Sequence, residues 1–320
     1  MDETEMKTEV TETKKRTNDP AGLAIWRAVY PLLIFFGVDT VLETVALLRY
    51  FVVATLNGSL DFAMLVSEAA TPAEAYLRTY QRIAELMTEW MAEEAQTILL
   101  IRCLILIPVF ILFIVRDDKR SAKKGYPIRI GVWNKGALTP KRILMTVVLA
   151  LTSFLGFNLL VTLIHVADID PIYRVAEQMI YSDSLWFTIL VTGIIAPILE
   201  ELLLRGLFYR RLRNRFSFVG ALVASSLTFG LIHGNLVQFI YASLMGAVLG
   251  YAYETSANLL IPILIHILAN CGSCVLTALV EGGILPADWA VWAELLIMVV
   301  GIAYVAVYVL VFRKDLEKSA

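Results

Sequence analysis

The chain has 320 residues, 58% of them hydrophobic, and its mean hydropathy is +0.72. This hydropathy lies outside the range of soluble globular domains and indicates an integral membrane protein. The formal net charge of −2 carries little information, because basic and acidic residues are segregated along the chain. The composition therefore excludes an ordinary soluble enzyme. The position of the charges along the chain is more informative than their sum.

The first 20 residues are polar and mixed in charge. They lack a short apolar core behind a basic start, so we expect a polar tail here and not a cleaved signal peptide. Cys103, Cys271 and Cys274 lie in apolar stretches, which argues against a disulfide framework. The C-x-x-C spacing of the last two lacks the strand-then-helix context of a redox site, so we expect a packing role for them.

Apolar stretches of about 20 residues are long enough to cross a bilayer as helices. Eight stretches are predicted to do so: 22–56, 97–115, 143–165, 186–209, 220–235, 238–256, 259–280 and 289–312. They predict an all-α, polytopic membrane helical bundle of about eight transmembrane helices. Asp39 and Glu43 interrupt the first stretch, and we expect a packing or capping role for them because no histidine or cysteine accompanies them.

The distribution of lysine and arginine predicts the orientation. Basic residues concentrate in the loop from Arg116 to Arg142 and in the turn 210–215. Because basic loops stay in the cytoplasm, both segments should be cytoplasmic, and an even number of spans places both termini there too. Residues 71–96, in the first outer segment, have the pattern of an amphipathic helix at the outer interface.

Two adjacent glutamates, Glu200 and Glu201, lie inside an apolar run. An ionised carboxylate at bilayer depth costs about 2.5–3.5 kcal/mol on insertion scales. Two such carboxylates therefore indicate that this part of the helix has a function. Glu201 and Arg205 are four residues apart, with the acid first, which favours an ion pair on a helix. Glu200 is rotated by about 100° and shares that partner less easily. One carboxylate is therefore predicted to be structural and the other free.

Two of the three histidines follow, each in a pair with i,i+4 spacing: Phe229 with His233, and His266 with Asn270. Residues at this spacing share one helix face. At a rise of about 1.5 Å per residue, Glu200, both histidines and the asparagine fall about 9–20 Å from the cytoplasmic boundary. This common depth predicts one shared site.

A carboxylate, two histidines and an asparagine suit water activation by a general base followed by stabilisation of an oxyanion. The product would be a peptide hydrolase that works inside the membrane. The same atoms also suit a metal, because Glu200, His233 and His266 would form a zinc site with an open position for water. The sequence leaves both uses open.

Other interpretations use the same residues differently. A glutamate pair at membrane depth is also typical of a proton-coupled transporter, although the internal repeats of such proteins are absent from this sequence. An isolated histidine on an apolar helix is most often a packed residue, and we interpret His165 in that way.

These residues resemble the CAAX-protease and bacteriocin-processing family (CPBP, or Abi) of intramembrane peptidases. Its pattern is E-E-x-x-x-R, then F-x-x-x-H, then H-x-x-x-N or H-x-x-x-D, on successive helices. In this chain the pattern is Glu200-Glu201-x-x-x-Arg205, Phe229-x-x-x-His233 and His266-x-x-x-Asn270. The resemblance covers roughly residues 140–280, and the N-terminal third resembles nothing known to us.

The resemblance implies an intramembrane endopeptidase that acts on membrane-associated or lipidated peptides, in CAAX-type processing or in bacteriocin maturation or immunity. Glu200 and His233 would activate the water, and His266 and Asn270 would form the oxyanion site. A glutamate mechanism without a cofactor is favoured, because Asn270 suits an oxyanion donor better than a metal ligand, and a zinc metalloprotease is the alternative.

The structural support of the site would come from Glu201, Arg205 and Phe229. The expected partners are the lipid bilayer and a membrane-embedded or lipidated substrate, with no nucleic acid, and the expected location is the cell membrane. The main alternative is a non-catalytic membrane immunity or binding protein that keeps the motif as structure.

Four parts are predicted along the chain. They are a polar cytoplasmic tail, N-terminal membrane helices with an outer amphipathic segment and a basic cytoplasmic loop, a protease core, and a last membrane helix with a short cytoplasmic tail. Their bounds are 1–20, 21–142, 143–280 and 281–320.

Overall fold

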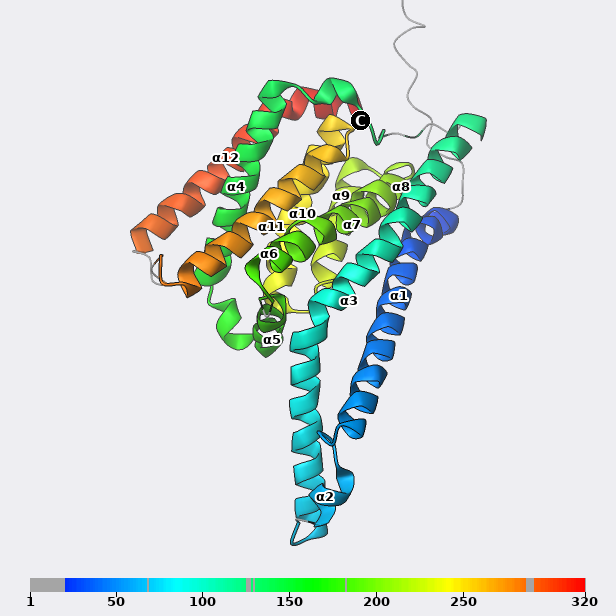
Figure 1. Cartoon of the computed structure of the whole chain (residues 1–320). Helices are drawn as coiled ribbons and strands as arrows, with labels where there is room; N and C mark the ends of the chain where they lie inside the picture. The colour runs from blue at the N-terminus through cyan, green and yellow to red at the C-terminus, as the bar shows by residue number, and fades with distance from the viewer. Residues whose placement is uncertain are drawn as a thin grey trace, which may run out of the picture.

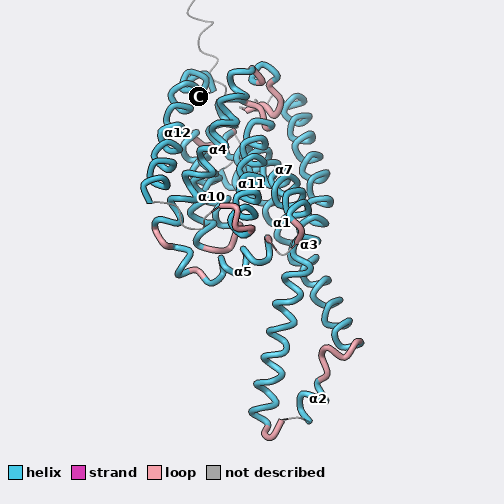
Figure 2. Tube along the Cα trace, turned by 60° about the vertical axis from the view of Figure 1, so that its left-hand side comes forward, coloured by secondary structure: helices cyan, strands magenta, loops and turns pink. Residues whose placement is uncertain are grey.

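The computed structural model describes residues 21–67, 69–124, 128, 130–181, 183–285 and 291–319. Within these residues the chain is helical with short connections, and it contains no strand (Figure 2). The main helices are α1 (Ala21–Leu56), α2 (Phe62–Ser67), α3 (Pro72–Lys124), α4 (Pro140–Leu163), α5 (Pro171–Ile180), α9 (Phe218–Leu231), α10 (Leu236–Ser256), α11 (Leu260–Glu281) and α12 (Val291–Ser319). A further long helix, Leu185–Arg213, is built from five shorter segments. The predicted tail 1–20 lies outside the described residues.

Seven helices of the described residues are long and apolar enough to cross a membrane, so the all-α, multi-pass architecture is confirmed. The eighth predicted stretch, 220–235, forms the shorter helix α9 of 14 residues. At about 1.5 Å per residue it extends about 21 Å, less than the hydrocarbon core of about 30 Å. The helix ends early because Gly234 takes a positive φ of 73° and Asn235 begins the next helix. Hydropathy alone does not detect this turn.

Polar caps fix where several helices begin. Thr139 accepts a hydrogen bond from the Arg142 N–H at the start of α4, and Asn235 accepts one from the Gln238 N–H at the start of α10. Each cap satisfies a backbone donor that the first turn of a helix leaves without a partner. These short-range signals hold the ends of the helices that surround the candidate site.

The helices form one bundle with α4 and α12 along one edge and α1 and α3 along the other (Figure 1). The helix Leu185–Arg213, α9, α10 and α11 lie between these two pairs. Gly156 of α4 and Gly301 of α12 allow the backbones at one edge to approach closely, because a Cβ atom on Gly301 would lie 2.5 Å from the Thr152 carbonyl oxygen. The residues of interest are therefore enclosed by helices on both sides.

Helix α3 has 53 residues, and at about 1.5 Å per residue it is about 80 Å long. The predicted amphipathic helix 71–96 forms, but as the first half of α3 and not as a separate element. Together with α2 and the end of α1 it projects away from the bundle (Figures 1 and 2). Arg49 and Glu94 form an ion pair between the two long helices, and Arg102 forms another with Asp39. The second pair agrees with a packing role for Asp39.

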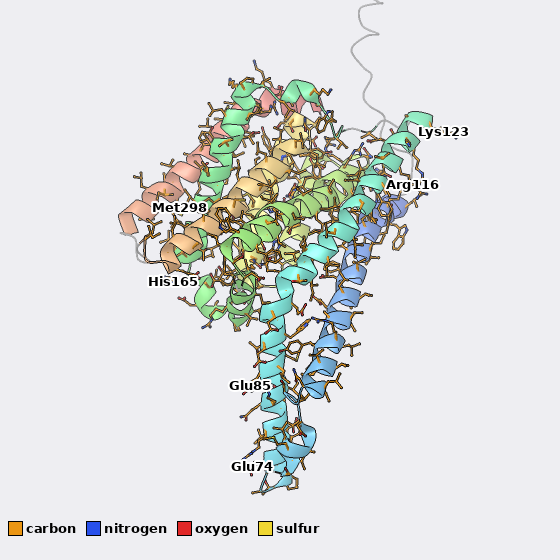
Figure 3. The ribbon with its side chains drawn as sticks, viewed as in Figure 1. Glu74, Glu85, Arg116, Lys123, His165 and Met298 are labelled. Atoms are coloured by element: carbon orange, nitrogen blue, oxygen red, sulfur yellow. The ribbon has the colours of Figure 1, made fainter. Side chains whose placement is uncertain are left out.

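Labelled residues mark the two ends of the bundle. Arg116 and Lys123 lie at the end where the C-terminus lies, and His165 lies at the opposite end (Figures 1 and 3). The basic residues and the C-terminus thus share one end, as the predicted orientation requires. The cytoplasmic location of that end stays a prediction.

Candidate active site

The two glutamates lie in a helix whose winding changes four times. Its segments are α6 (Leu185–Thr188), a π-helix (Ile189–Ile195), α7 (Ala196–Glu201), a second π-helix (Leu202–Tyr209) and α8 (Arg210–Arg213). Segments of π-helix are rare and occur frequently at functional sites, because the wider turn redirects side chains and frees backbone groups. The glutamates end the short α-helical segment between the two wide ones.

Pro197 leaves a carbonyl of the first π-helix without its backbone partner, and Asn270 bonds to that carbonyl. The Ala196 N–H donates to the Val191 carbonyl, five residues back. The next bond of this pattern would join the Thr192 carbonyl to residue 197, which is proline and has no N–H. The side-chain amide of Asn270 donates to that carbonyl instead, at 3.1 Å. The predicted oxyanion donor is therefore fixed in place by a carbonyl that the π-helix exposes.

Gln96 holds Thr192 from the other side. Its side-chain oxygen accepts from the Thr192 hydroxyl at 3.0 Å, and its amide donates to the Ile180 carbonyl at 2.9 Å. The Gln96 side chain is buried, so both bonds are made away from water. Sequence reasoning missed these two residues, although a glutamine at the edge of an apolar stretch was the available signal.

The predicted pair of Glu201 and Arg205 is present. Both side chains are fully buried, and Arg205 Nη1 donates to Glu201 Oε1 at 2.7 Å. Arg205 Nη2 donates to the Gly246 carbonyl at 2.9 Å, and the guanidinium carbon lies 4.8 Å from the centre of the Phe229 ring. The pair thus ties the glutamate helix to α9 and α10.

His266 lies between the two glutamates. Its Nδ1 is 3.0 Å from Glu201 Oε1, and its Nε2 is 3.6 Å from Glu200 Oε2. The His266 side chain is 5% exposed and that of Glu200 is 19% exposed, so the two meet at the edge of the buried region. The resemblance placed His233 beside Glu200, whereas the contact with Glu200 in the structure comes from His266.

Phe229 connects the two histidines. Its ring contacts the His233 ring edge-on at 5.1 Å between centroids and the His266 ring at 5.3 Å. His233 Nδ1 is 2.8 Å from the Phe229 carbonyl oxygen. A carbonyl only accepts, so Nδ1 carries the hydrogen and Nε2 has the free lone pair. Phe229 therefore sets the position of both rings, and the predicted contact with His233 is present.

A shared cap holds the turn that carries His233. Asp170 accepts from the N–H groups of Leu236 and Val237 at 2.7 and 3.1 Å, and from those of Ile172 and Tyr173 at 3.1 Å. Burial acts to raise the pKa of the Asp170 carboxyl, but the four N–H donors outweigh burial and hold the pKa below its ordinary value. One carboxylate thus caps both α5 and α10, the helix that follows His233.

Two comparisons with known proteins bear on this site. Residues 182–272 match the model of a family described as "Type II CAAX prenyl endopeptidase Rce1-like". The matched segment contains all seven motif residues in order. This match and the relative described below support the assignment of this segment to the CAAX-protease and bacteriocin-processing family. The resemblance drawn from the motif is confirmed.

A Bacillus subtilis (strain 168) protein named "Putative membrane peptidase YdiL" is 30% identical to this chain over 82 residues. The alignment covers 26% of this chain and 34% of that protein, so the chain spans about a third of the relative that it matches. No solved structure matches the chain at a significant level. The CPBP segment lies within the predicted core, and the bounds of the four predicted parts stay predictions.

His165 and the three cysteines are the other residues that the sequence singled out. The His165 side chain is 78% exposed and lies 3.1 Å from Asp168, so the interpretation of His165 as a packed residue is wrong. Cys271 donates to the Gly193 carbonyl at 3.5 Å, and Cys103 and Cys274 are buried thiols. All three cysteines are free.

Two of the three side chains predicted as zinc ligands lie side by side in the structure. Glu200 and His266 are adjacent, but among the described residues no group of three or more His, Cys, Asp or Glu side chains converges as a metal site. Metal dependence stays a question for experiment.

Proposed function

We propose that the chain is an intramembrane endopeptidase that hydrolyses peptide bonds of membrane-associated or lipidated substrates in the cell membrane. The observation that carries this proposal is the Glu200 carboxylate, which lies in an apolar helix with its oxygen 3.6 Å from the buried His266 ring. Its family and the name of its relative support the same activity. A partly exposed carboxylate beside a histidine is a competent general base.

In the proposed reaction Glu200 removes a proton from a water molecule while the water oxygen attacks the substrate carbonyl carbon. His233 orients this water through Nε2, because Nδ1 is already bonded to the Phe229 carbonyl. Phe229 keeps the His233 ring in position. The carbon–nitrogen bond breaks when the leaving nitrogen receives the proton that Glu200 removed from the water.

The negative charge on the carbonyl oxygen is stabilised by His266 and Asn270. An asparagine amide has two N–H donors. One donates to the Thr192 carbonyl, which leaves the second for the oxyanion. A well-placed donor of this kind contributes about 2.7–4 kcal/mol to the transition state. The π-helix that exposes the Thr192 carbonyl thus serves the site by orienting Asn270.

The substrate class can be tested with matched peptides. Purified protein in nanodiscs is incubated with a prenylated peptide that ends in a C-a-a-X sequence, and with the same peptide lacking the prenyl group. We expect mass spectrometry to show cleavage of the prenylated peptide, and loss of cleavage in the His233→Ala variant. His165→Ala, at an exposed residue that is not part of the motif, is the control and should cleave normally.

The outcomes separate the candidate functions. Cleavage of both peptides at similar rates would support an endopeptidase that does not read the lipid. Cleavage of neither, by protein that is folded and tested with a panel of membrane peptides, would contradict the proposal and favour the binding or immunity protein. Cleavage that persists in His233→Ala would contradict the role of His233.

A further inference from the structure

The two nitrogens of the His266 ring contact two different glutamates. Nδ1 is 3.0 Å from Glu201 Oε1, and Nε2 is 3.6 Å from Glu200 Oε2. The Glu201 side chain is 0% exposed and that of His266 is 5% exposed. The ring also packs edge-on against Phe229. Its orientation is therefore fixed on three sides.

The partners of Glu201 decide which ring nitrogen carries the hydrogen. Glu201 Oε1 accepts from Arg205 Nη1 at 2.7 Å, and arginine stays protonated in proteins. A carboxylate paired with a guanidinium is ionised and can only accept hydrogen bonds. The hydrogen of the contact between Glu201 and His266 therefore belongs to Nδ1. In the neutral ring the lone pair is then on Nε2, which faces Glu200.

We propose that Glu201 is a positioning residue that holds His266 in the Nδ1–H tautomer and directs Nε2 toward Glu200. This inference rests on the proposed function and changes the part that His266 plays in it. A lone pair on Nε2 cannot donate to an oxyanion, so His266 must first receive a proton. Glu200, 3.6 Å away, is the group that supplies it.

The proton then follows one path through the reaction. Glu200 takes it from water as the new carbon–oxygen bond forms, and passes it to His266 Nε2. The Nε2–H group donates to the oxyanion and then transfers its proton to the leaving nitrogen as the carbon–nitrogen bond breaks. His266 returns to its neutral form and the carboxylic acid product ionises. A carboxylate that orients a proton-carrying histidine in this way is the general logic of catalytic triads.

A purely structural role for Glu201 predicts something different. In that case the carboxylate only neutralises Arg205, and removing both charges together should restore the site. Replacing a buried ion pair with apolar residues of similar volume is often neutral for stability or stabilising. The double variant Glu201→Leu/Arg205→Met therefore removes the contact to His266 without leaving a buried charge alone.

The tautomer can be read directly by NMR. The chain has three histidines, so protein labelled with ¹⁵N-histidine in detergent micelles gives few signals. Signals that disappear in His266→Gln belong to His266. In the wild type we expect the ¹⁵N shifts of the Nδ1–H tautomer, and in the double variant a mixture or the Nε2–H form. A predominant Nε2–H tautomer in the wild type, or an unchanged tautomer in the double variant, would overturn the proposal.

Kinetics give the second readout. For the folded double variant we expect kcat to fall by about 10²- to 10⁴-fold with KM changed by only a few-fold, because only the reacting state loses a partner. Full activity in that variant would overturn the positioning role. Arg213→Met/Glu254→Leu removes another buried pair, with side chains 1% and 0% exposed, and should leave both readouts unchanged. If the wild type cleaves no peptide, the proposed function fails while the NMR result still decides the tautomer.

Discussion

Removing Arg205 alone should destabilise the protein strongly. The Arg205→Met variant leaves the Glu201 carboxylate fully buried, with His266 as its remaining hydrogen-bond partner among the described residues. It also removes the bond to the Gly246 carbonyl and the contact with the Phe229 ring. Breaking a buried pair from one side costs about 3–5 kcal/mol, because the remaining charge is not compensated. Among the described residues Glu201 Oε2 already lacks a hydrogen-bond partner, so no bond at that oxygen compensates for the loss of Arg205.

The assay is unfolding in a mixed-micelle denaturant titration, followed by tryptophan fluorescence. Arg313→Met is the matched control, because Arg313 and Glu317 are also four residues apart but are 69% and 62% exposed. An exposed pair of this kind contributes about 0–1 kcal/mol. We therefore expect a large shift for Arg205→Met and little or none for Arg313→Met. Equal shifts for the two variants, or a shift for Arg205→Met below about 1 kcal/mol, would refute the reasoning.

Two further predictions concern the groups that hold the site. The pKa of Asp170 is lowered, so the ionised carboxylate that caps α5 and α10 stabilises the fold at every pH above the ordinary carboxyl pKa of about 3.9. This stabilisation is lost as the pH falls through the lowered pKa. Between pH 6 and pH 3 the wild type should lose more stability than Asp170→Asn in the same titration, and parallel curves would contradict the capping role. Pro197→Ala restores an N–H that can bond the Thr192 carbonyl, so Asn270 should lose its fixed partner. We expect a fall in kcat of about tenfold or more with unchanged stability, since oxyanion donors act in the transition state, and an unchanged kcat would exclude this positioning.

Contacts between residues close in sequence could be predicted because helical spacing alone determines them. The i,i+4 rule gave the pair of Glu201 and Arg205 and the contact of Phe229 with His233, and both are present. Hydropathy located the long spans but overextended α9, because it does not register the turn at Gly234. That turn was visible only as a glycine followed by a good helix cap.

Contacts between helices could not be predicted from spacing. His266 reaches the glutamates across 65 residues of chain, and the sequence does not state which of the two histidines would lie beside Glu200. The Thr192 carbonyl that holds Asn270 lies in the first π-helix, and sequence spacing does not predict this winding. The depth argument predicted that these residues share a site, but not their pairwise partners.

The central claim is that Glu200 activates the water that cleaves a peptide bond. The most direct test is single-turnover cleavage of a prenylated C-a-a-X peptide in nanodiscs by the wild type and by Glu200→Gln, which keeps the size of the side chain and removes its basicity. Glu317→Gln, at an exposed carboxylate that pairs with Arg313, is the control for charge loss. Our account predicts cleavage by the wild type and the control, and a rate at least about 10²-fold lower for Glu200→Gln. Cleavage by Glu200→Gln at the wild-type rate would contradict it.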